Sequence, residues 1–270
     1  SIKMNKKIID NSETQVYNKF TSESGHWYTQ EGEPMYTIIG ANGKERNTNL
    51  RDDKLLNLVP SVTTVMDLIA KPSLENWKIN QALNSALSLE QEDGESDGSF
   101  IYRCKQEAKK PGMEAADLGT KIHGMIERGF LGQSTNKPYK AVRKYLDEHY
   151  PDETWIAEDS FCASQGYGGM IDLYSESGIF VDFKTKDNLK GKNPKRLVYD
   201  SHAMQLSAYA QGLGFDNPER VSIFVDRKQT DLIACYIWDQ ESHEKHLAMF
   251  NSILTYWKLS KNYDPAGELI

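Results

Sequence analysis

The stretch GGMIDLYSESGIFVDFKTKD, residues 168–187, decides how this sequence is expected to fold. Two segments with alternating side chains lie on either side of the ESG tripeptide at 176–178, a pattern typical of a β-hairpin. On the second strand Ile179, Val181 and Phe183 share one face, because successive side chains of a strand point to opposite sides. That face is apolar, so we expect it to pack against a helix.

The first strand of the hairpin has the same alternation but carries a charge. Asp172 lies on the face of Met170 and Tyr174, whereas Ile171 and Leu173 lie on the opposite face. Each strand therefore offers one apolar face to a helix. The remaining face of the pair is expected to hold polar and charged groups.

The second strand adds Asp182 and Lys184 to this charged face, next to Phe180. Carboxylates crowded on one sheet face repel each other and need a cation nearby. An aspartate pair with open water positions suits Mg²⁺ or Mn²⁺. Lys184 would lie beside such a metal, where it could orient or help to deprotonate an attacking water and stabilise charge on a phosphate. The alternative is a hairpin on the surface, in which Asp182 and Lys184 are solvated neighbours.

The GTKIHGMIE segment favours the first of these interpretations. Gly119, His123 and Glu127 recur every four residues along a predicted helix, beside an apolar stripe. The apolar stripe consists of Leu118, Ile122 and Ile126. A histidine next to such a stripe is usually a structural residue, but with an acid one turn further on it can also hold a metal.

Two further features point toward the same region. Gln205 and Tyr209 are four residues apart on the helix predicted after the hairpin, and alone they are typical of a helix face in water. The segment 184–196 is strongly basic although the whole chain is acidic, so it predicts either a solvated loop or contact with a phosphate backbone. Its basic residues are Lys184, Lys186, Lys190, Lys192, Lys195 and Arg196.

The composition limits the classes of function. The formal net charge is −7, with 39 acidic and 32 basic residues, which argues against a protein that coats nucleic acid or an anionic membrane. No run approaches the ~18 apolar residues of a membrane span, and the first residues lack the apolar stretch of a signal peptide. Three widely separated cysteines predict reduced thiols without a metal-binding spacing.

The rest of the chain reads as helices followed by strands. Residues 1–58 are expected to form a peripheral segment with a short β-hairpin around ANGKE. Residues 59–270 are expected to form a larger nuclease-like domain, with a helical part at 59–150 and a catalytic core at 151–270. A helix over roughly 100–110 should break at KKPG, and a new one should follow it. The order of elements predicts an α/β fold, with a central mixed sheet flanked by helices and an α-rich N-terminal half.

The motifs in this order resemble the PD-(D/E)XK nuclease superfamily. They are His123, the GGMID segment ending at Asp172, the VDFK segment with Asp182 and Lys184, and Gln205-x-x-x-Tyr209. The resemblance runs from about residue 60 to the end. It is closest to the RecB-type branch with its Gln-x-x-x-Tyr motif, and within it to mitochondrial genome maintenance exonuclease-like and phage exonucleases.

The resemblance implies a restriction-endonuclease-like core that cleaves phosphodiester bonds and leaves 5′-phosphates. His123, Asp172, Asp182 and the carbonyl of Phe183 would be metal ligands, with Glu127 as an outer ligand. Lys184 would be the catalytic lysine, and Gln205 and Tyr209 would position it, the water or the scissile strand. Ser61 and Thr63 match a pair at a helix start that can hold a phosphate, although capping of the helix explains them equally well. DNA contacts would come from Lys186, Lys190, Lys192 and Arg196.

The sequence therefore predicts a metal-dependent exonuclease that acts on single-stranded DNA or DNA ends in recombination, repair or replication. It would use one or two Mg²⁺ or Mn²⁺ ions and no iron–sulfur cluster. The expected location is the cytoplasm of a bacterium or a phage-infected host, and the oligomeric state is left open, with a monomer favoured. A structure-specific endonuclease of the same fold and a DNA-end-binding module without activity remain the alternatives.

Overall fold

A five-stranded mixed sheet forms the centre of the computed structural model, which describes residues 25–267. The strand order is β5-β6-β7-β8-β9, and only β7 and β8 run parallel. The strands are β5 (Trp155–Ala163), β6 (Tyr167–Ser175), β7 (Ile179–Lys186), β8 (Glu219–Asp226) and β9 (Ile233–Ile237). The turn predicted at 176–178 is confirmed, with Gly178 at a φ of 98° that favours glycine.

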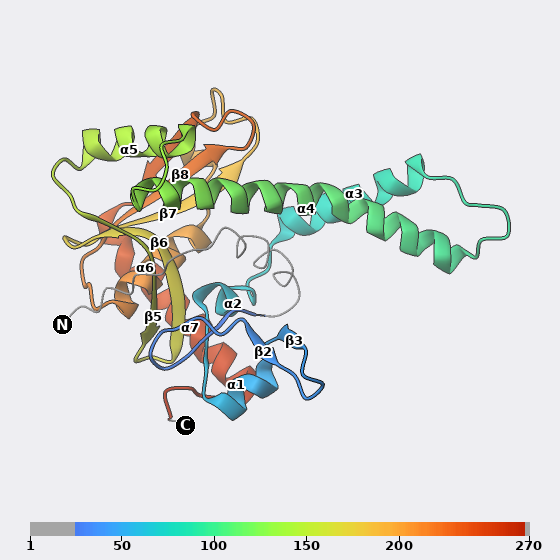
Figure 1. The fold of residues 1–270 in the computed structure, drawn as a ribbon, viewed down its shortest axis with the longest axis horizontal. Helices are drawn as coiled ribbons and strands as arrows, with labels where there is room; N and C mark the ends of the chain where they lie inside the picture. Colours follow the sequence, from blue (N-terminus) through green and yellow to red (C-terminus); the bar gives the residue numbers. More distant parts are fainter. Residues whose placement is uncertain (1–24, 268–270) are drawn as a thin grey trace.

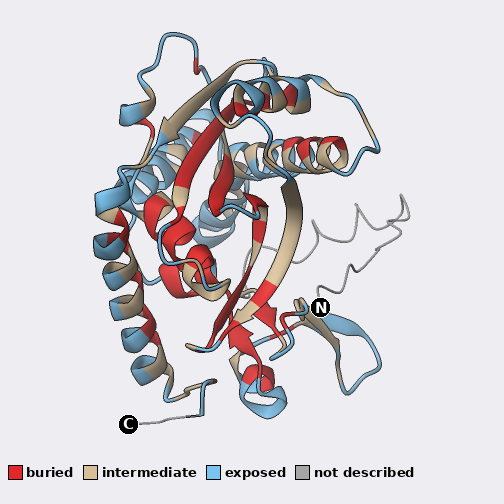
Figure 2. Cartoon of the chain, turned by 90° about the vertical axis from the view of Figure 1, so that its left-hand side faces the viewer, coloured by how far each residue is buried: buried red, intermediate tan, exposed pale blue. Residues whose placement is uncertain are grey.

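Helices cover both faces of this sheet (Figure 1). On one face α4 (Asp97–Phe130) and α5 (Lys137–His149) enclose a core with the apolar side of β7, as predicted for that side. On the other face lie α6 (Asp200–Gly212) and α7 (His243–Lys261). Buried residues follow the middle of the strands and α6 in Figure 2. The expected α/β class with a central mixed sheet is confirmed, and so is the α-rich N-terminal half.

The region before the sheet consists of short elements. Strand β1 (Trp27–Tyr28) pairs with β4 (Val59–Pro60), and β2 (Thr37–Ile39) pairs with β3 (Glu45–Asn47) in a hairpin around the ANGKE turn. Two short helices, α1 (Leu50–Leu56) and α2 (Val62–Met66), follow. The buried side chain of Trp27 belongs to the same core cluster as residues of α6 and α7. A domain boundary near residue 58 stays a prediction.

The helix break expected at KKPG is wrong. Helix α4 continues through Pro111, and α3 (Pro72–Ser88) lies beside it. A proline inside a helix removes one backbone hydrogen bond and costs about 3 kcal/mol. Here the ring of Trp77 in α3 lies beside Gly112, the residue directly after Pro111. In addition, the C-terminal part of α4 is buried in the core, which holds the helix in place. Tertiary packing outweighs the local penalty.

The strict alternation expected for the first hairpin strand is also wrong. Ile171 and Leu173 belong to different apolar clusters, on opposite faces of the sheet. The register with the partner strand β5 is the same on both sides of this point, but Glu158 and Asp172 between them do not pair, and Glu158 has a positive φ of 49°. A residue with a positive φ departs from the extended conformation of a strand, so the alternation is interrupted there.

The face of the hairpin that carries the aspartates also holds an aromatic pair, because Tyr174 and Phe180 stack on each other in the core that includes α6. The predicted apolar stripe of α4 is wrong in part, since Leu118 is 42% exposed and does not join Ile122 and Ile126 in the core. Between residues 25 and 267 no helix has the length and apolar character needed to cross a membrane. The three cysteines are unpaired.

Candidate active site

The two central strands separate where both carry an aspartate. Strands β6 and β7 pair at Leu173–Val181 and Tyr174–Phe180, and the pairing ends there. Beyond this point the backbone N–H of Phe183 donates to Oδ2 of Asp172 at 2.7 Å, so a side chain replaces the next rung of the ladder. The separation brings Asp172 and Asp182 to one notch in the sheet.

A chain of polar contacts runs from β7 to α6. Nζ of Lys184 lies 2.7 Å from Oδ2 of Asp182 and donates to Oε1 of Gln205 at 3.0 Å. Nε2 of Gln205 in turn donates to the hydroxyl of Tyr209 at 2.7 Å. The predicted Gln-x-x-x-Tyr pair therefore acts on the lysine through Gln205, and Tyr209 fixes the amide. The side chain of Lys184 keeps 29% of its surface exposed, so it remains accessible.

Burial and like charge dominate the titration of Asp182. Its side chain is 4% exposed, and burial together with the Asp172 carboxylate raises its pKa to about 6 despite Lys184. Apart from the ion pair with Lys184, Oδ2 of Asp182 has no hydrogen-bond partner. A buried carboxylate beside a second one favours a further cation at this position.

His123 lies on the opposite side of the aspartates, on α4. Its Nδ1 is 3.7 Å from Oδ1 of Asp172, and its ring meets the ring of Phe183 edge to face. Burial alone would raise the pKa of Asp172, but His123, the N–H of Phe183 and Lys184 together lower it. Burial would lower the pKa of His123, but the carboxylates of Asp172 and Asp182 raise it above its usual value.

Two glutamates add to the acidic character of the site. Burial and the charge of Asp172 raise the pKa of Glu127, the predicted outer ligand. Burial, Asp172 and Glu127 raise the pKa of Glu158 well above its usual value. Glu158 is the residue of β5 with a positive φ, and sequence reasoning missed it because such a residue in the middle of a strand leaves no clear pattern.

The donor set suits a hard divalent cation, although the side chains are not preassembled around one. Over residues 25–267 no group of three or more His, Cys, Asp or Glu side chains stands in an arrangement that could hold a metal ion. The carboxylates instead pair with His123 and Lys184. Burial, together with the charge of Asp172, nevertheless raises the pKa values of Asp182 and Glu127, and an ion with oxygen ligands would offset the cost of keeping these carboxylates charged.

The basic segment after β7 lies partly against the site. Nζ of Lys186 is 5.8 Å from the ring centre of Tyr199, and burial, Lys192 and Arg227 lower its pKa. Arg227 donates to the carbonyl of Thr185 and was not found from the sequence, where only its position directly after a buried strand marks it. The other predicted DNA contacts, Lys190, Lys192 and Arg196, are exposed.

Ser61 and Thr63 differ in their surroundings. Ser61 is 3% exposed and caps α2, accepting a hydrogen bond from the N–H of Thr64 at 3.0 Å. Its hydroxyl also contacts those of Thr63 and Thr64. Thr63 is exposed. Capping accounts for Ser61, and a role of the pair in phosphate binding stays a prediction.

Comparisons with known proteins add little to this geometry. No family model matches the chain, and no curated protein sequence does. Among solved structures, an alkaline exonuclease from Laribacter hongkongensis is similar at 12% identity and a TM-score of 0.31, over 70% of this chain and 98% of the other. The protein SSO0001 is similar at 16% identity and a TM-score of 0.30, over 70% and 88%. TM-scores this low do not decide the fold or the activity of this chain.

Proposed function

We propose that this protein is a metal-dependent deoxyribonuclease that acts as an exonuclease on single-stranded DNA or DNA ends. The contact chain Asp182–Lys184–Gln205–Tyr209, beside Asp172 at the point where the strands separate, is the observation that supports this most directly. A purely structural hairpin would have no need to hold a lysine between a buried carboxylate and a buried amide.

The proposed metal ligands are His123, Asp172 and Asp182, with the carbonyl of Phe183 as a further candidate. A bound Mg²⁺ or Mn²⁺ ion would polarise the phosphate and lower the pKa of a bound water. Glu127 and Glu158 would add negative charge around the ion. The number of carboxylates supports a divalent cation as cofactor. The cleavage assay described below compares Mg²⁺ with Mn²⁺.

Lys184 would face the phosphate. Gln205 accepts from Nζ and fixes its direction, while Asp182 forms an ion pair with the same ammonium group. In that orientation the lysine would stabilise negative charge that develops on the phosphate and position the attacking water. The water oxygen would bond to phosphorus and the P–O3′ bond would break, which leaves a 3′-hydroxyl on one product and a 5′-phosphate on the other. Lys186, Lys192 and Arg227 would bind the neighbouring phosphates of the strand.

Purified protein with linear single-stranded DNA, labelled at either end, in Mg²⁺, Mn²⁺ or EDTA tests this proposal. Stepwise shortening from one label that requires metal would support an exonuclease and give its polarity. Cleavage of circular single-stranded DNA would instead favour an endonuclease of the same fold. Binding of DNA ends without cleavage in any metal would favour a binding module and contradict the proposal.

A further inference from the structure

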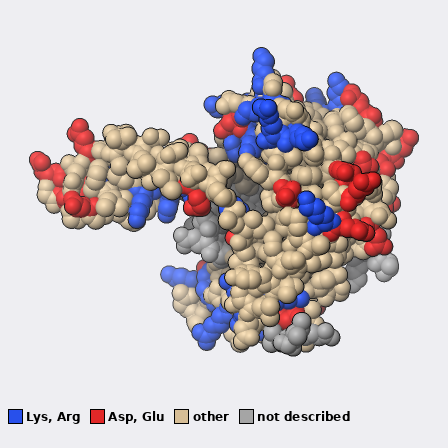
Figure 3. All heavy atoms as spheres, turned by 180° about the vertical axis from the view of Figure 1, so that it is seen from behind, with Lys and Arg blue, Asp and Glu red and all other residues tan. Residues whose placement is uncertain are grey.

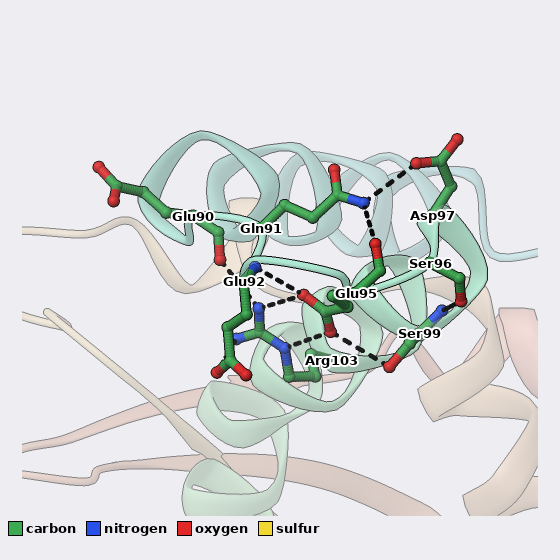
Figure 4. A network of polar contacts seen from close by, with 8 residues as sticks. All are labelled: Glu90, Gln91, Glu92, Glu95, Ser96, Asp97, Ser99 and Arg103. Carbon is green, nitrogen blue, oxygen red and sulfur yellow. Dashed lines mark hydrogen bonds and ion pairs between the residues drawn. The ribbon is translucent and has the colours of Figure 1, made fainter.

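The guanidinium group of Arg220 in β8 is 1% exposed, and its hydrogen-bond partners within residues 25–267 include no carboxylate. On the face drawn in Figure 3, basic side chains reach the surface and several lie beside acidic ones. Helices α3 and α4 form an arm that projects from the body (Figure 1), and Arg103 near its tip shows the usual arrangement. Its Nε and Nη2 donate to the two carboxylate oxygens of Glu95 (Figure 4). A buried charge without such a partner depends on the neutral groups around it.

Four neutral acceptors surround the terminal N–H groups of Arg220. Nη1 donates to Oγ of Ser207 at 3.0 Å and to Nδ1 of His246 at 3.1 Å. Nη2 donates to the carbonyl of Asp239 and to Oγ of Ser242, both at 2.8 Å. Burial lowers the pKa of Arg220 to about 10, so the guanidinium group stays charged at neutral pH.

These hydrogen bonds determine the protonation state of His246. A guanidinium group has donors only, so Nδ1 of His246 accepts and carries no proton. The proton of the neutral ring is then on Nε2, which donates to Oδ1 of Asp200 at 3.4 Å. A charged imidazole would turn a second N–H toward Nη1 of Arg220 and place two positive groups 3.1 Å apart in a buried site.

His243 is held in the same state through Ser207. A hydroxyl group both accepts and donates, and Oγ of Ser207 accepts from Arg220. It lies 3.0 Å from Nδ1 of His243. Within residues 25–267 no other contact of Ser207 offers its hydroxyl proton an acceptor, so Nδ1 of His243 accepts that proton. His243 is 5% exposed, and its imidazole is therefore neutral as well.

We propose that His243 and His246 form a pH switch between α6 and α7, which is closed while both imidazoles are neutral and opens when they are protonated. Ser207 belongs to α6, Arg220 to β8 and the two histidines to the first turn of α7, so the switch joins three elements. Ser207 is two residues from Gln205 and lies on the opposite side of α6, because successive residues of a helix are about 100° apart. The switch therefore lies behind the candidate active site.

The other charged groups nearby do not cancel this effect. They are Asp200 of α6, Asp216 and Asp239 in the loops beside β8 and β9, and Glu244 and Lys245 of α7. Burial is the largest influence on His243 and His246 and lowers both pKa values from the usual 6.5, and Arg220 lowers them further. The carboxylates oppose these two effects without reversing them.

Both histidines should make the folded state less stable in acid. Their pKa values are lower in the folded than in the unfolded state, so the unfolded state binds the protons more tightly. The stabilising contribution is full above pH 6.5 and is lost as the pH falls through the folded-state values. In that range each histidine can change the equilibrium constant of unfolding by up to about tenfold per pH unit.

Nitrogen-15 NMR of the full chain tests the protonation states directly, because the chemical shifts of the two ring nitrogens distinguish the neutral tautomers. We expect His243 and His246 to be neutral at about pH 7, with the proton on Nε2, and to titrate below pH 6.5. His243→Asn and His246→Asn assign the signals. A proton on Nδ1 of His246, or titration of both rings above pH 6.5, would overturn the proposal.

His246→Asn separates the charge of the ring from its packing. Oδ1 of asparagine can accept from Arg220 in place of Nδ1 but takes up no proton. Between about pH 7 and about pH 5, the equilibrium constant of unfolding in urea should rise at least about threefold more for the wild type than for this variant. His149→Asn, at an exposed position of α5, is the matched control and should keep the pH dependence of the wild type.

Amide hydrogen exchange tests the opening itself. At about pH 5 the first turn of α7 should be less protected in the wild type than in the double variant His243→Asn/His246→Asn, with each rate corrected for its local sequence. Equal protection, or equal pH dependence of unfolding for the wild type and His246→Asn, would contradict the switch.

Discussion

The chemistry of the candidate site depends on a few side chains whose positions are fixed by others. Lys184 contacts both Asp182 and Gln205, and Gln205 is held in turn by Tyr209. In the proposed reaction Gln205 would therefore position the lysine and would not itself react.

Gln205→Leu should lower kcat by roughly 10–100-fold, because the ammonium group loses its orientation. The affinity for DNA should change little, since the charge of Lys184 remains. Single-turnover cleavage and DNA binding, measured on the same preparation, separate the two effects. A loss of binding that matches the loss of rate would contradict a positioning role.

Asp53 of α1 offers a prediction about stability. Its side chain is fully buried, neither carboxylate oxygen has a hydrogen-bond partner, and burial raises its pKa to about 8 from the usual 3.8. The folded state thus binds the proton more tightly than the unfolded state. The contribution of Asp53 to stability is full below pH 3.8 and is lost as the pH rises through 8.

Asp53→Asn removes this dependence on pH. The variant should be more stable than the wild type by a few kcal/mol at pH 8, and the difference should shrink toward pH 5. Urea denaturation at several pH values measures it, with Asp231→Asn as a control at an exposed position. A difference that does not vary with pH would contradict the assignment.

The elements of the fold differ in how far they could be predicted from the sequence. The hairpin strands β6 and β7 and the helix α6 after them lie where the sequence predicts them, although the alternation within β6 is interrupted. The continuity of α4 through Pro111 could not be predicted, since packing against Trp77 of α3 and burial of the distant end of α4 offset the proline. The irregular conformation of Glu158 was equally hidden, because a positive φ in the middle of a strand leaves no pattern in the sequence.

Two glycines of α4 test how closely this helix packs. A Cβ at Gly129 would lie within 2.1 Å of the ring of Tyr139 in α5, whereas one at Gly124 would meet only the end of the flexible Arg128 side chain at 3.2 Å. Gly129→Ala should therefore cost about 1–3 kcal/mol, and Gly124→Ala should be neutral or stabilise by up to about 1 kcal/mol. Thermal unfolding of both variants measures this. Equal effects would contradict the close contact of α4 with α5.

At the scale of the whole molecule, the sheet brings together residues that are far apart in the sequence. His123 of α4, the aspartates of β6 and β7, and Gln205 of α6 meet only because helices cover both faces where the strands separate. The sequence could predict these side chains by their type and order. It could not predict that His123 and Lys184 pair with the aspartates, that Glu158 joins them, or that an arm extends from the body, because each depends on tertiary packing.

The most direct measurement of the central proposal is single-turnover cleavage of end-labelled single-stranded DNA, with Mg²⁺ or Mn²⁺, by the wild type and Lys184→Gln. The account predicts cleavage by the wild type that EDTA abolishes, and a rate at least about 100-fold lower for the variant with DNA binding retained. Lys245→Ala, at an exposed position of α7, is the control and should cleave like the wild type. Equal cleavage by Lys184→Gln and the wild type would contradict the proposed active site.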